Sequence, residues 1–128
     1  MSLIKTVTVA GTQYNIAQAP AIQQKKLLSL VGGRIAFNKA RESEIDFGFL
    51  VGTLLGMPED LLDQVAGIVL QKAFKHGADS PVAVEDFQGR ITEYYRLIAE
   101  GIRVNLDDFF DFLASSKAEA EGTKEPVQ

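Results

Sequence analysis

The sequence predicts a mainly α fold: a small helical domain of about five helices with an N-terminal β-hairpin. Residues 4–17 place β-branched side chains on either side of a turn signal, whereas the chain beyond them repeats its apolar residues at helical spacing. The 128 residues are 46% hydrophobic and 23% charged, as in ordinary globular proteins. We expect a single domain over 1–113 and a flexible tail over 114–128, where apolar residues are scarce.

The hairpin is predicted over residues 4–17. Residues 4–9 read Ile-Lys-Thr-Val-Thr-Val, a β-branched run that disfavours a helix. Ala10-Gly11-Thr12 is a turn signal, and residues 13–16 alternate polar and apolar side chains again. A two-stranded hairpin alone is marginally stable, so one of its faces should pack on helices.

The first helix is predicted over about residues 20–31. Pro20 suits a first helical turn, and the pair Gly32-Gly33 is a stop signal. The apolar stripe between them consists of Ile22, Leu27, Leu30 and Val31. Residues 34–42 fit either a helix or a charged linker, and both alternatives stay open.

A second helix is predicted over 44–56, with a start signal at Ser43. Its apolar residues cover most of the helix circumference, so it should be buried by its own domain or by another chain. Gly48, Gly52 and Gly56 recur at every fourth position and form a bare ridge. Close packing inside the domain is the main interpretation of this ridge. The alternative is self-association, through Phe47, Gly48, Phe49, Gly52 and Gly56.

Three more helices are predicted in the second half of the chain. One begins at Pro58, has Lys72, Lys75 and His76 in its last turn, and ends before Gly77. A long helix over about 85–104 carries the stripe Phe87, Ile91, Tyr94, Tyr95, Ile98 and Ile102. Asn105 is predicted to cap a last helix that carries Leu106, Phe109, Phe110, Phe112 and Leu113.

The composition excludes several classes of function. A net charge of −4 provides no positive field for nucleic acid or an anionic membrane. The lack of cysteine excludes a disulfide scaffold and a thiolate zinc site, and a single histidine leaves little for Ser–His chemistry. The first residues lack a secretory signal, and the most apolar run, 47–57, is too short to span a bilayer. We therefore expect a cytoplasmic protein that is not an enzyme and has no cofactor, metal, nucleic-acid or membrane partner.

Two polar features invite a chemical interpretation. Asp107, Asp108 and Asp111 resemble a metal-binding cluster, but they lack a calcium-loop pattern and fit a solvated acidic helix face better. His76 invites a general-base role, but no partner stands near it in sequence, so we expect it to act as a cation at a helix C-terminus.

The aromatic cluster is the most informative feature of the last helix. Phe109, Phe110 and Phe112 fall within four residues and cover more than half of a short helix. One or two of the rings can enter the core, and the third should point elsewhere. Core packing and an interface remain alternatives for the group as a whole.

Two stretches resemble the tail assembly chaperones of long-tailed bacteriophages and prophages. The first runs from Asp86-Phe87-Gln88-Gly89-Arg90 through Tyr94-Tyr95-Arg96-Leu97-Ile98 to residues 105–113. The second is the hairpin 5–16 followed by Ala19-Pro20-Ala21. The similarity covers about residues 4–113, with little contribution from 34–60.

The resemblance implies a small, mostly helical protein of the host cytoplasm that binds the aggregation-prone tape measure protein before the tail tube forms. It further implies self-association, and contact with the tail tube protein through a longer form made by translational frameshifting. We take Phe109, Phe110 and Phe112 as the candidate client-binding residues. The alternative function is a structural virion component, such as a tail-completion or connector protein, that is retained in the particle.

Overall fold

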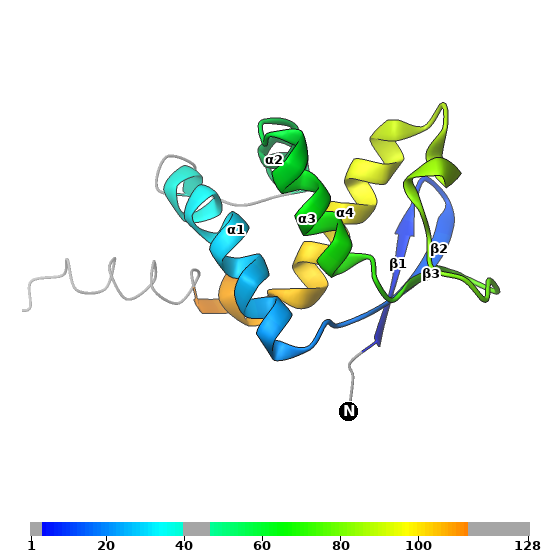
Figure 1. Cartoon of the computed structure of the whole chain (residues 1–128), viewed down its shortest axis with the longest axis horizontal. Helices are drawn as coiled ribbons and strands as arrows, with labels where there is room; N and C mark the ends of the chain where they lie inside the picture. Colours follow the sequence, from blue (N-terminus) through cyan, green and yellow to red (C-terminus); the bar gives the residue numbers. More distant parts are fainter. Residues whose placement is uncertain (1–3, 40–46, 113–128) are drawn as a thin grey trace, which may run out of the picture.

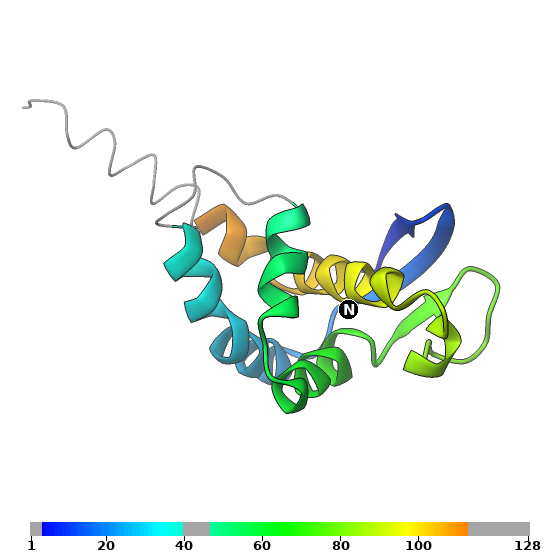
Figure 2. The same ribbon diagram turned by 90° about the horizontal axis from the view of Figure 1, so that it is seen from above.

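The structure is a computed structural model that describes residues 4–39 and 47–112 (Figure 1). Its elements are β1 (Ile4–Val9), β2 (Thr12–Ala17), α1 (Ala21–Lys39), α2 (Phe47–Leu55), α3 (Glu59–Val69), β3 (Ala73–Lys75), the short 3-10 helix η1 (Val84–Phe87) and α4 (Ile91–Asn105). Residues 107–112 are also helical. The predicted mainly α fold is confirmed, and a small sheet lies at the end of the molecule opposite to α1 (Figures 1 and 2).

The predicted hairpin is confirmed and gains a third strand. β1 and β2 pair antiparallel, and the last pair is Val9 with Thr12. Ala10 and Gly11, which join the strands, have φ angles of 50° and 83°. Two positive φ angles define the tight turn that matches the natural twist of a hairpin. β3 pairs antiparallel with the other side of β2 and completes the order β1-β2-β3.

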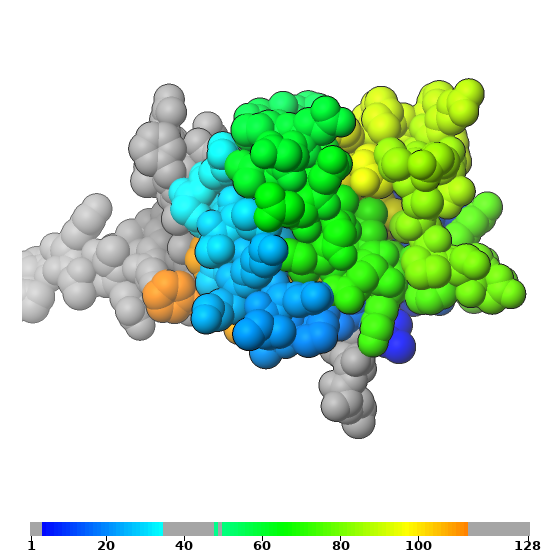
Figure 3. Space-filling view, viewed as in Figure 1, coloured from blue at the N-terminus to red at the C-terminus, as the bar shows by residue number. Residues whose placement is uncertain are grey.

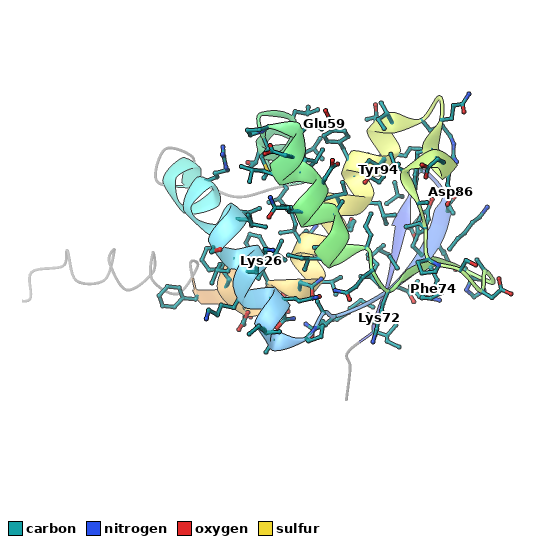
Figure 4. All side chains as sticks on the ribbon, viewed as in Figure 1. Lys26, Glu59, Lys72, Phe74, Asp86 and Tyr94 are labelled. Carbon is teal, nitrogen blue, oxygen red and sulfur yellow. The ribbon has the colours of Figure 1, made fainter. Side chains whose placement is uncertain are left out.

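The prediction of one helix from Pro58 to the residue before Gly77 is wrong in its second half. α3 ends at Val69, and residues 73–75 form β3 instead. The N–H of Ala17 donates to Lys72 O at 3.1 Å, and that of His76 donates to Gln13 O at 2.9 Å. The open edge of β2 therefore recruits this segment, because its backbone groups need partners. Lys72 and Phe74 lie on the sheet side of the molecule (Figure 4), so neither Lys72, Lys75 nor His76 belongs to a last helical turn.

The prediction that Gly32-Gly33 ends the first helix is also wrong. α1 runs through both glycines to Lys39, so 34–39 are helical, while 40–42 lie outside the described residues. Gly32 is buried, and a Cβ built on it would lie 2.8 Å from Leu28 Cδ1 and 3.9 Å from Phe109 Cζ. A glycine inside a helix lowers helix stability by about 1 kcal/mol relative to alanine. Close packing around Gly32 offsets this loss.

The predicted long helix over 85–104 is two elements. η1 ends at Phe87, and α4 begins at Ile91 after a turn in which Gly89 has a φ of 81°. A helix cannot pass through a residue in that conformation, so the break falls here. Phe87 is buried against the rings of Tyr14 and Tyr94, at centroid distances of 6.4 and 5.5 Å.

α4 is the central element of the core. It contacts α2, α3, η1 and two strands of the sheet. Its buried residues include Leu97, Ile98 and Ile102, whereas Ile91, a member of the predicted stripe, is 52% exposed. The end of α4 lies beside the first turns of α1, where the candidate site forms.

Candidate functional site

A groove of about 470 Å³ lies between the first two turns of α1 and the segment after α4. Its α1 wall consists of Ala21, Gln24, Lys25 and Leu28, and its other wall and floor consist of Asn105, Leu106, Asp108, Phe109 and Phe112. Figure 3 shows residues 107–112 directly beside α1. The size falls within the roughly 300–1,000 Å³ range of ordinary binding pockets.

The floor of the groove is held by a buried amide. The Asn105 side chain is 3% exposed, its Oδ1 accepts the Ala19 N–H at 2.7 Å, and its Nδ2 donates to Gly101 O at 2.9 Å. Gln18 Nε2 donates to Val104 O at 2.8 Å beside it. These bonds fix the start of α1 against the end of α4.

The prediction that Asn105 caps the last helix is therefore wrong. Asn105 is the final residue of α4, and its side-chain oxygen faces the chain before α1. The next helical turn starts from Leu106, whose carbonyl accepts the N–H of Phe110 at 3.1 Å. The amide joins segments far apart in sequence, which a local capping pattern cannot show.

The three predicted client-binding phenylalanines have different surroundings. Phe109 and Phe110 are half-buried against the core, with ring centroids 5.8 Å apart. Phe112 is 64% exposed. Phe109 and Phe112 line the groove and Phe110 does not. The binding role of all three stays a prediction.

The rims of the groove carry opposite charges. Lys25 lies on the α1 wall and Asp108 on the opposite wall, and both are exposed. Neither forms an ion pair with any residue that the structure describes. Asp107 and Asp111 are also exposed, and no three carboxylates or histidines within residues 4–39 and 47–112 are placed to hold a metal ion.

The α1 wall was not foreseen from the sequence. Leu28 is partly exposed and lies outside the predicted stripe, while Ile22 belongs to that stripe and is exposed. The one sequence feature that indicates this wall is Leu28, a leucine that lies off the main apolar stripe of α1. Its partner segment lies about 80 residues later, so only the fold reveals the groove.

The predicted self-association surface on α2 is partly described. Gly48, Gly52 and Gly56 are exposed, while Leu50 and Leu54 are buried. Among the described residues, a Cβ on Gly52 would meet no atom within 4 Å, and one on Gly56 would meet only the carbonyls of Gly52 and Thr53. The prediction that Gly52 and Gly56 allow close packing inside the domain is therefore wrong for the part of the chain that the structure describes.

The second-chain alternative for α2 stays a prediction. Leu55, next to this ridge, is 66% exposed. The side chains of Phe47 and Phe49, and the predicted start of the helix at 44, lie outside what the structure describes.

A second cavity, of about 310 Å³, lies between α3, the loop before η1 and Tyr94. Asp63 and Gln71 contribute its other polar side chains. Burial, followed by the negative charge of Asp63, raises the pKa of the Tyr94 hydroxyl. No sequence pattern predicted this cavity, because its lining comes from α3 and the turn after it, the segment 81–84 and α4.

The fold and the groove define a small helical protein with a largely apolar groove between two oppositely charged rims. In the described part of the chain no helix is long and apolar enough to cross a membrane. Residues 10–117 match the family model described as "Phage tail assembly chaperone protein, TAC". The chain therefore belongs to this family, and the resemblance inferred from its sequence is confirmed. No curated protein and no solved structure matches the chain.

Proposed function

We propose that this protein binds the tape measure protein in the host cytoplasm and keeps it soluble during tail assembly, without catalysing a reaction. The observation that carries this proposal is the apolar groove beside α1, which ends in the exposed ring of Phe112. Membership of the tail assembly chaperone family supports it. A holding chaperone needs accessible apolar surface for its client and charge to remain in solution, and the chain has both.

Two further partners belong to this proposal. The protein associates with copies of itself, and a longer form made by frameshifting brings the tail tube protein to the complex. Both follow from the family resemblance, and the exposed ridge and Leu55 of α2 support the first of them.

The test is co-expression with the tape measure protein of the same phage, followed by centrifugation and immunoblotting of the soluble fraction. The wild-type chain should raise the soluble share of the client several-fold. Phe112→Ala should lose much of this effect, because Phe112 supplies exposed apolar area at the groove. Ile91→Ala is the matched control, since Ile91 is also exposed but begins α4, about 20 Å of helix from the groove.

A soluble client in the absence of this chain would contradict the proposal, as would equal effects of the two variants. Mass spectrometry of purified particles provides the second test. A chaperone should be absent from mature particles, whereas a tail-completion or connector protein should be present in them.

A further inference from the structure

We propose that the groove selects an amphipathic helix whose apolar stripe has acidic residues on the flank facing α1 and basic residues on the flank facing 107–112. This inference rests on the proposed function, because it specifies the chemistry of the client segment that the groove accepts.

The walls of the groove are long enough to contact two turns of a bound helix. Ala21, Lys25 and Leu28 follow each other at i, i+4 and i+7 and form one stripe over two turns of α1, about 10 Å long. Phe109 and Phe112 face this stripe from the other wall, on a second helical segment. Two turns accommodate the i, i+3/i+4 and i+7 anchors by which amphipathic helices enter apolar grooves.

The backbone around the groove favours a helical client over an extended one. Both walls are helical, and beyond its first turn α1 pairs its N–H and C=O groups along the helix axis. An added strand would find no open sheet edge there, and its own backbone groups would lose water without gaining partners. A helix satisfies its backbone internally and presents only side chains to Leu28, Leu106 and the two rings.

The two rims of the groove carry charges of opposite sign. Lys25 stands on one wall and Asp108 on the other, and both side chains are exposed. Among the described residues neither Lys25 nor Asp108 has an ion-pair partner, and a client flank of the opposite charge would supply one. A client helix with charges of the same sign on both flanks would be repelled by one of the two rims.

Three synthetic peptides with one leucine stripe test the inference by fluorescence anisotropy. The first has one glutamate and one lysine flank, the second has two lysine flanks, and the third has two glutamate flanks. The wild-type protein should bind the mixed peptide about three- to ten-fold more tightly than either of the others, as expected for a few exposed ion pairs. This preference should fade in 1 M salt, where the screening length falls to about 3 Å.

Rim variants should redirect the preference. Lys25→Glu makes both rims acidic and should favour the two-lysine peptide, whereas Asp108→Lys makes both basic and should favour the two-glutamate peptide. The double variant should prefer the mixed peptide again, bound in the opposite direction. Lys72→Glu and Asp79→Lys are matched controls, because they make the same changes of net charge at exposed positions away from the groove. Melting curves verify that each variant is folded.

The outcomes separate this inference from the proposed function. Equal affinity for the three peptides, with the tape measure protein still solubilised, would overturn the charge selectivity and leave the chaperone role intact. The expected preferences together with failure to solubilise the client would support the selectivity and contradict the role. Sedimentation of the proteins without peptide gives the last outcome. If Lys25→Glu then had a different oligomeric state from wild type, a second copy of the chain would occupy the groove, and the inference would be overturned.

Discussion

The side-chain oxygen of Asn105 accepts a 2.7 Å hydrogen bond from the backbone N–H of Ala19, 86 positions earlier in the chain. Ala19 lies just before α1 and Asn105 just before the segment 107–112, so this bond joins the starts of both walls of the groove. The other half of the amide donates to Gly101 O. One buried side chain thus fixes the spacing of the walls.

Removing this amide should destabilise the protein. Asn105→Ala leaves the buried Ala19 N–H without its acceptor, which should lower the free energy of unfolding by about 1–3 kcal/mol. Gln24→Ala is the control, because its bond to Asn105 is longer, at 3.4 Å, and only part-buried. Urea denaturation followed by circular dichroism measures both. Equal losses in the two variants would mean that Asn105 does not organise the groove.

The phenylalanines should differ in their effect on stability according to their burial. Phe112→Ala should leave melting almost unchanged, because that ring is 64% exposed. Phe87→Ala should cost about 3–5 kcal/mol, since its ring is fully buried between two tyrosines. Phe109→Ala and Phe110→Ala should fall between these limits. Thermal melting of the four variants checks the order, and unfolding by Phe112→Ala would contradict the placement of its ring.

Local signals in the sequence were sufficient for part of the fold. The hairpin followed from β-branched residues around Ala10 and Gly11, because such turns are specified by the residues inside them. The start of α3 followed from Pro58 and the acidic residues behind it. Phe109 and Phe112 were candidates for binding because aromatic residues exceeded what a short helix can bury.

Contacts between distant segments decided the rest. Residues 73–75 have a helical pattern, yet they pair with β2 because that strand has an edge to satisfy. Gly32 reads as a stop, yet α1 continues through it and places it within ordinary contact distance of Phe109. The α1 wall of the groove acquires a role only through Asn105 and the chain after it. None of these contacts leaves a periodic trace in one sequence.

The close approach of α3 and α4 depends on Gly101. A Cβ at Gly101 would lie 2.8 Å from Val69 Cβ and 2.9 Å from its Cγ2. These atoms sit near a rigid backbone, so Gly101→Ala should destabilise the fold by about 1–3 kcal/mol. Gly33→Ala is the matched control: no atom of the described residues outside its own helix backbone lies within 4 Å of its Cβ, and it should stabilise α1 by up to about 1 kcal/mol. Chemical denaturation measures the change in the free energy of unfolding for each variant. A change of the same sign in both variants would refute the close α3–α4 contact.

Glu100 should make stability depend on pH. Burial raises the pKa of its carboxyl above the usual 4.5, although attraction to Arg103 and Arg96 lowers it in part. The folded chain therefore holds this proton more tightly, and the associated stability is present at acid pH and lost as the pH rises through the raised pKa. Glu100→Gln should gain stability relative to wild type as the pH increases from about 4 to 8. If wild type instead gained stability relative to Glu100→Gln over this range, attraction to the arginines would outweigh burial.

The exposed ridge of α2 should govern self-association. Gly52→Leu adds a side chain where no described atom outside the helix's own backbone lies within 4 Å of the Cβ, so the monomer should stay folded and gain up to about 1 kcal/mol of helix propensity. In an oligomer that brings α2 of two chains together, the same side chain would hold the helices apart. Sedimentation velocity at high micromolar concentration should therefore show a smaller species for Gly52→Leu than for wild type. Gly33→Leu, at an equally open position on α1, should sediment like wild type. A wild-type chain that remains monomeric at these concentrations would rule out the interface, and unfolding of Gly52→Leu would instead indicate a partner for α2 within the same chain.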